Sequence, residues 1–116
     1  MHGTIYKVLS RAALDAAKAK GRFDGSADDA RDGFIHFSSA GQLEGTLTKH
    51  YAGQSGLVLL AVDATSLGDR LQWEPSRGGD LFPHLYGPLD LKALVWDEPL
   101  ELEADGRHRL PARVLP

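Results

Sequence analysis

The feature that most constrains the fold is an unbroken apolar run, residues 57–62, which reads LVLLAV. A half-buried strand alternates apolar and polar residues, whereas a run without polar residues belongs to a strand covered on both faces. The run is far too short to cross a bilayer, which needs about 20 residues. It therefore predicts the central strand of a sheet with packed layers on both sides, and no membrane association is expected.

The segments before this run predict two strands and a helix. Residues 4–9 are rich in side chains that favour a strand. Residues 11–20 are rich in alanine and predict a helix, with a capping serine before them and a glycine after them. Residues 24–32 are polar and predict a loop with a single helical turn after Ser26. Residues 34–37 form a short apolar run that predicts a buried strand.

The remaining segments predict a second helix and more strands. The helix is expected to follow Ser39, which has Gln42 at capping-box spacing, and to end near Tyr51. Residues 82–89 contain two prolines and a glycine, which predict an ordered turn rather than a regular element. Further strands are expected at residues 71–74, 91–97, 100–104 and, along an edge, in the tail 107–116. Two short helices among about six strands indicate an α+β fold in a single domain, 1–116.

Composition narrows the classes of function. The 116 residues suit one domain with one core. Thirteen basic and sixteen acidic residues give a net charge of −3 without a basic run, so duplex nucleic acid is not an expected partner. The absence of cysteine excludes disulfides and thiolate chemistry. The first residues do not resemble a secretory signal, and a cytoplasmic location is expected.

His36 is the most informative residue for chemistry. It stands between Ile35 and Phe37, so in a strand its side chain points to the opposite face, together with Phe34. An imidazole in that position is partly desolvated and needs a hydrogen-bond partner or a ligand. The residue alone favours a core histidine paired with a backbone carbonyl, and a histidine that serves a ligand is the alternative.

Ser38 and Glu74 are further candidates. Ser38 and Ser39 close the expected strand and open a helix, and the free N–H groups of a helix start suit an anion such as phosphate. Ser39 equally suits a simple helix cap. Glu74 follows Trp73 and is suited to act as a base or to accept hydrogen bonds from sugar hydroxyls, unless it is an exposed strand residue.

Residues 82–88 gather two aromatics, a histidine, two prolines and a glycine. Such a segment loses little conformational entropy on binding, which predicts a preorganised binding turn, a plug that closes one end of the core, or both. Its His84 also completes a zinc ligand set with His36 and Glu74. That alternative stays open, although no local spacing asks for a metal.

Four blocks of the chain resemble, in order, those of a bacterial family known as domain of unknown function 952. The blocks are Tyr6-Lys7-Val8, Gly33-Phe34-Ile35-His36-Phe37-Ser38, Trp73-Glu74 and Phe82-Pro83-His84-Leu85-Tyr86-Gly87. Some members carry the label "glutathione S-transferase related", for which this chain is too short. The resemblance covers nearly the whole chain and implies a small bacterial protein of a family that has no established activity.

Residues 36–63 are also distantly similar to the core of the RNA 2′-phosphotransferases. In those enzymes a strand ending in His-Leu-Ser, or similar, opens a helix, and an apolar strand that closes on Asp follows. This resemblance implies the ADP-ribosyltransferase-like fold, a split, mainly antiparallel sheet with a cleft for a nicotinamide dinucleotide. It implies that His36 and Ser38 contact the dinucleotide. It also implies that Tyr86 stacks on a ring, and that Glu74 holds a ribose hydroxyl.

These observations define the expected site. The candidate catalytic residues are His36 and Glu74. The candidate ligand-binding residues are Lys7, Ser38, Gln42, His84 and Tyr86. NAD is a candidate substrate, and neither a resident cofactor nor a metal is expected. The first hypothesis is an ADP-ribosyltransferase-like transferase. Since basic residues are few, a non-catalytic domain that binds a nucleotide or another small ligand is the second, and a histidine–metal enzyme is the third.

Overall fold

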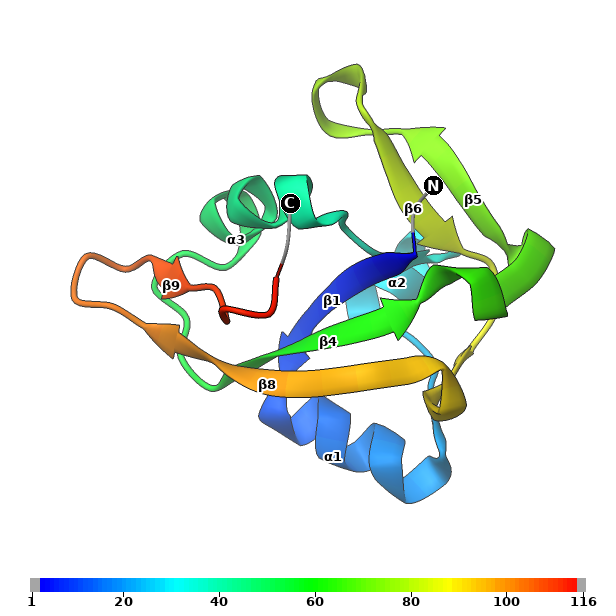
Figure 1. Cartoon of the computed structure of the whole chain (residues 1–116), viewed down its shortest axis with the longest axis horizontal. Coiled ribbons are helices and arrows are strands. Elements are labelled where there is room, and N and C mark those ends of the chain that lie inside the picture. The colour runs from blue at the N-terminus through cyan, green and yellow to red at the C-terminus, as the bar shows by residue number, and fades with distance from the viewer. Residues whose placement is uncertain (1–2, 115–116) are drawn as a thin grey trace.

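The apolar run becomes strand β4 (Leu57–Asp63), of which six residues are buried. It lies between β1 (Thr4–Ser10) and β8 (Leu94–Leu102) and is antiparallel to both (Figure 1). The structure is a computed structural model and describes residues 3–114. The predicted central strand is therefore confirmed.

Alternate residues of β4 belong to two apolar clusters, one on each face of the sheet. One cluster contains Val58 and Leu60 and is covered by helix α1 (Arg11–Lys20). The other contains Leu57 and Leu59 and is covered by helix α3 (Leu43–His50). Leu59 and Leu60 are both fully buried, which is why the run has no place for a polar residue.

A third helix, α2 (Ala27–Asp32), forms where a loop with one helical turn was expected. The expectation of two helices was therefore wrong. The reason is a capping box in which the Asp29 backbone N–H donates to Ser26 Oγ and the Ser26 N–H donates to the Asp29 carboxylate. The helix ends at Gly33, whose φ of 86° is the left-handed conformation that glycine adopts most easily.

A second sheet packs beside the first, with strand order β3-β6-β5. Its strands are β3 (Ile35–His36), β6 (Leu81–Leu85) and β5 (Leu71–Pro75). Tyr6 and Ser38 exchange two backbone hydrogen bonds of 2.8 and 2.9 Å, and these join β1 to the end of the second sheet. The strand expected at residues 34–37 is shorter than predicted, because β3 contains only Ile35 and His36.

The expected turn at 82–89 was wrong for residues 82–85, which belong to the regular strand β6, whereas the chain does bend at residues 86–87. Pro83 lies inside β6, and its carbonyl accepts a 3.0 Å hydrogen bond from the Phe37 N–H. A proline cannot donate to a neighbouring strand. Here the chain still pairs with Pro83 past the end of β3, through the Phe37 N–H, so the sheet loses only the one bond that a proline cannot donate.

The two strands expected at 91–97 and 100–104 form the single strand β8, which continues through Pro99. Strand β9 (His108–Arg109) pairs with β8 only at Glu101 and Leu102, so Pro99 lies on an edge of the sheet, where proline is tolerated. The predicted edge strand in the tail is confirmed, and residues 115–116 lie outside the described part of the chain.

Shorter elements complete the described chain. Strands β2 (Arg22–Phe23) and β7 (Leu89–Asp90) form a small antiparallel pair. The 3-10 helices are η1 (Ala40–Gln42), η2 (Ala64–Arg70), η3 (Arg77–Gly79) and η4 (Leu91–Ala93). None of the helices within residues 3–114 is long and apolar enough to cross a membrane. The predicted α+β class is confirmed.

Truncation of a central-strand residue tests the doubly covered strand. Leu60→Ala should lower the free energy of unfolding by about 2–5 kcal/mol, because it opens a cavity at a fully buried position. Val95→Ala, at a side chain that is 58% exposed, should change it by less than about 0.5 kcal/mol. Urea denaturation followed by circular dichroism measures both. Equal effects of the two substitutions would contradict the assignment of β4 to the core.

Candidate functional site

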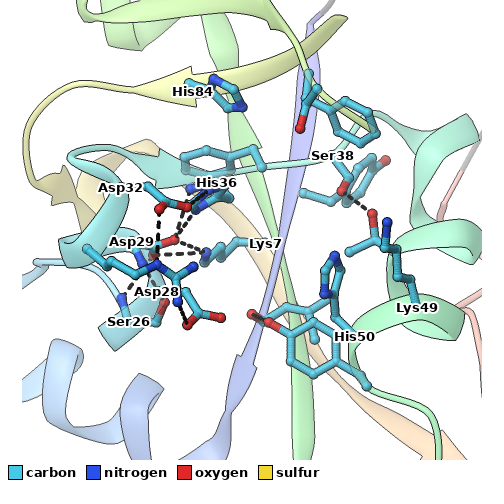
Figure 2. A pocket seen from close by; sticks show the side chains of 18 of the residues that line it. Lys7, Ser26, Asp28, Asp29, Asp32, His36, Ser38, Lys49, His50 and His84 are labelled. Carbon is cyan, nitrogen blue, oxygen red and sulfur yellow. Dashed lines mark hydrogen bonds and ion pairs between the residues drawn. The ribbon is translucent and has the colours of Figure 1, made fainter. Parts of the chain in front are cut away.

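A cavity of about 510 Å³ opens above β1, between the side chains of α2 and those of α3 (Figure 2). His36 of β3 lies on the α2 side, Lys7 of β1 lies at the base, and His84 of β6 lies at one end. The volume falls within the range of about 300–1,000 Å³ that is usual for small-molecule sites. The polar side chains in its lining come from five helices and strands, namely β1, α2, β3, α3 and β6, and from the segments that connect them.

Asp29 is the residue on which these elements converge. Its carboxylate is almost fully buried and lies 3.0 Å from the Nζ of Lys7. It also accepts from the Ser26 N–H at 2.9 Å and from the His36 N–H at 3.2 Å, and its Oδ1 lies 2.5 Å from His36 Nδ1. One side chain therefore fixes β1, the start of α2 and β3 relative to one another.

The surroundings of Asp29 determine its ionisation. Burial acts to raise the pKa of Asp29, but the hydrogen bond with His36, the charge of Lys7 and the Ser26 N–H together outweigh burial. The pKa of the Asp29 carboxyl therefore lies well below its usual range. Burial lowers the pKa of Lys7, and the Asp29 carboxylate opposes that shift. A buried carboxylate with this many donors is an effective orienting group for an imidazole.

His36 is held from one side and reaches the cavity with the other. Asp29 binds its Nδ1, and its Nε2 lies 2.9 Å from Oδ2 of Asp32. A neutral imidazole donates from only one nitrogen, so the two carboxylates are both satisfied as acceptors only when the ring is doubly protonated. In the neutral tautomer that donates from Nδ1 to Asp29, Nε2 is the nitrogen that can accept a proton from a ligand. This arrangement suits proton transfer.

A second imidazole is held in the same way. His84 is almost fully buried, and its Nδ1 lies 2.8 Å from Oε1 of Glu74, which also accepts from the Tyr86 hydroxyl at 2.8 Å. These bonds from His84 and Tyr86 lower the pKa of Glu74, and the bond to Glu74 raises the pKa of Tyr86. The rings of His36 and His84 meet edge to face, with centroids 5.6 Å apart. The cavity is thus lined by two histidines that are each oriented by a carboxylate.

The structure brings four of the seven predicted site residues into one lining. They are Lys7, His36, Ser38 and His84. Glu74 and Tyr86 do not line the cavity and reach it through His84. Gln42 also lies outside the lining, where it accepts from the Ser39 N–H and donates to the Leu81 carbonyl.

The two walls of the cavity differ in charge. The α2 wall carries Asp28 and Asp32 beside Asp29, and Arg31 pairs with the first two of these at 3.1 Å. The α3 wall carries Lys49 and His50. Ser38 faces this second wall and exchanges a 2.8 Å hydrogen bond with the hydroxyl of Thr46. A ligand that spans the cavity meets acceptors on one side and cationic or donor groups on the other.

The sequence does not reveal the α2 wall, because the polar residues 24–32 predict a loop with a single helical turn. Asp29 and Asp32 are the most important residues of that wall, because they contact the two ring nitrogens of His36. One signal was present: Ser26 and Asp29 have capping-box spacing, and a helix places Asp29 and Asp32 on the same face. The later pairing of both with His36 has no local signature.

The zinc alternative required Glu74 beside the two histidines. Glu74 instead occupies Nδ1 of His84 as a hydrogen-bond partner, at 2.8 Å. Within residues 3–114, no group of three or more histidine and carboxylate side chains has an arrangement that could hold a metal ion.

The fold and the cavity define a small α+β protein with a polar, histidine-lined pocket. Residues 8–97 match the family described as "Protein of unknown function (DUF952)", and the chain belongs to this family. The predicted membership is therefore confirmed. No protein with a curated record matches the chain.

Solved structures of a relative share this fold. The crystal structure of CC0527 from Caulobacter crescentus is 55% identical, with a TM-score of 0.89 over 91% of this chain and 93% of that one. The solution structure of CC0527 is 56% identical, with a TM-score of 0.81 over 90% of each chain.

Removal of the Asp29 charge tests its central position. Asp29→Asn should lower the free energy of unfolding by about 3–5 kcal/mol, because it leaves the buried Lys7 without its counter-charge. Asp28→Asn removes the same charge from an exposed side chain of the same helix and should cost less than about 0.5 kcal/mol. Chemical denaturation at pH 7 measures both. Similar losses for the two variants would contradict the assigned position.

The lowered pKa of Asp29 also predicts a pH dependence. Because the unfolded chain, with a carboxyl pKa of about 3.9, binds a proton more readily, the contribution of Asp29 to stability is complete above about pH 4. It is lost as the pH falls through the lower pKa of the folded state. The stability difference between the wild type and Asp29→Asn should therefore shrink as the pH is lowered from about 6 to about 2. A constant difference, in denaturation curves across that range, would refute the assignment.

Proposed function

We propose that the cavity binds a nucleotide-like ligand that carries ribose and phosphate, of the class of NAD and ADP-ribose. His36 is its proton-transfer group. The observation that carries the proposal is the His36 imidazole, which is fixed through Nδ1 by the buried Asp29 and lines an open cavity together with Asp32, the partner of its Nε2. That position suits general acid–base work on a bound hydroxyl.

The asymmetry of the cavity supports this ligand class. Carboxylates accept hydrogen bonds from sugar hydroxyls, and Asp32 lies on the α2 wall. Phosphate is favoured by cations and by hydroxyl and N–H donors, and Lys49 with Ser38 and Thr46 lies on the α3 side. A ligand with a ribose at one end and a phosphate at the other matches both walls.

The distant likeness to RNA 2′-phosphotransferases supports the same class. Two antiparallel sheets joined at Tyr6 and Ser38 are compatible with the split sheet of the ADP-ribosyltransferase fold. In a ribosyl transfer, departure of nicotinamide builds positive charge on the ribose, which a nearby carboxylate stabilises. In this proposal Glu74 acts by orienting His84 through their hydrogen bond. Lys7 acts by neutralising Asp29, which in turn orients His36.

A second candidate is a domain that binds such a ligand without transforming it. One observation favours it: Asp32 already occupies Nε2 of His36, the nitrogen that chemistry would need. Few basic residues line the cavity, so a transferred phosphate would find little charge stabilisation.

Titration calorimetry with ADP-ribose and NAD tests the binding. The wild type should bind ADP-ribose with a dissociation constant below about 1 mM. Lys49→Ala should weaken binding about tenfold or more, because a bond between two charged groups contributes about 1.5–3 kcal/mol. Lys92→Ala, which removes an exposed lysine outside the cavity lining, should leave the affinity unchanged. If neither ADP-ribose nor NAD binds the wild type at millimolar concentration, the proposal is refuted.

Turnover separates the two candidates. Chromatography of NAD after incubation with the wild type and with His36→Ala measures nicotinamide release. Release by the wild type that is lost in His36→Ala supports transfer or hydrolysis at the ribose. Binding with NAD recovered unaltered supports the non-catalytic domain.

A further inference from the structure

We propose that Asp32 selects the ligand by binding the paired hydroxyls of a ribose, so that the cavity prefers ligands with an intact vicinal diol. This inference rests on the proposed function, since it names the part of the ligand that lies against the α2 wall. Nothing in the sequence singled out Asp32, and its position becomes apparent only in the folded chain.

The contact between Asp32 and His36 is open to the cavity, unlike the contact on the other ring nitrogen. The side chains of Asp32 and His36 are each 35% exposed, whereas that of Asp29 is only 2% exposed. Asp29 is therefore a fixed part of the protein framework. The Asp32 carboxylate and His36 Nε2, 2.9 Å apart, instead form a polar pair that a ligand can reach.

The chemistry of this pair matches a diol better than an anion. A carboxylate accepts from two hydroxyls at once, and an imidazole nitrogen beside it can accept from or donate to either of them. The carboxylates of Asp29 and Asp32 lie within 3 Å of opposite sides of the same ring, and Asp28 lines the same wall. A phosphate placed here would face this negative charge, so the ligand's anionic part belongs near Lys49.

The second oxygen of Asp32 has a partner outside the ring pair. Arg31 Nε donates to Asp32 Oδ1 at 3.1 Å. This bond holds the carboxylate at the end of α2 while Oδ2 faces His36. A diol that binds Oδ2 and Nε2 therefore meets a carboxylate that is already oriented, which lowers the entropic cost of recognition.

In a competing interpretation, the Asp32 carboxylate occupies the position beside His36 Nε2 that an anionic group of the ligand would take. Under that interpretation a phosphate would displace Asp32 from His36, and neutralising Asp32 would strengthen the binding of every anionic ligand. The two interpretations therefore predict opposite effects of Asp32→Asn on affinity.

The experiment uses three probes: ADP-ribose and the two analogues that lack the 2′-hydroxyl of the adenosine ribose or of the terminal ribose. Calorimetry on the full chain should show that one analogue binds the wild type about tenfold more weakly than ADP-ribose, the factor expected when a hydrogen bond to a charged group is lost. Asp32→Asn should weaken the binding of ADP-ribose by a similar factor. The same substitution should leave the affinity for the more weakly bound analogue nearly unchanged.

A matched control makes the result specific. Asp15→Asn carries out the same chemical change on an exposed residue of α1, outside the cavity lining, and should preserve the wild-type preference. Circular dichroism checks that both variants are folded. Equal binding of all three probes by the wild type, or tighter binding of all three by Asp32→Asn, would overturn the inference and leave the proposed function standing. Failure of the wild type to bind any probe would overturn both.

Discussion

The buried carboxylate of Asp29 is the interaction on which the site depends. It completes the cap of α2, neutralises Lys7 on β1 and binds both the backbone and the ring of His36 on β3. A buried charge is tolerated only when it is paired and hydrogen-bonded, and each of these bonds helps to meet that requirement. The same bonds orient the imidazole of His36. The interactions that stabilise this part of the fold are therefore also the ones that fix the position of the histidine in the site.

The fold was largely predictable where the composition of a single segment is enough to determine how that segment is buried. The run at 57–62 required cover on both faces, and it became β4 between two apolar clusters. The prediction failed around Pro83 and Pro99, since the sequence predicts a turn at 82–89 and two separate strands at 91–97 and 100–104. Both lie inside strands, where Pro83 is paired with Trp73 and Pro99 with Val58, and this pairing depends on the tertiary structure.

The site was predictable only in part, for a similar reason. The sequence predicts that the imidazole of His36, placed in an apolar strand, needs a hydrogen-bond partner, and it does not decide between a backbone carbonyl and a ligand. The structure supplies two carboxylates from α2, a helix that sequence reasoning reduced to one turn. Glu74 and Tyr86 are predicted as site residues, whereas in the structure both lie outside the cavity lining, and Glu74 is bonded to His84 and to Tyr86.

Most of the cavity lining comes from one continuous stretch, residues 26–54, which supplies both walls on either side of β3. The strands that hold the two apolar clusters contribute only a base and one end. Substitutions within this single segment would therefore reshape the cavity, while the buried strand β4 keeps the scaffold constant.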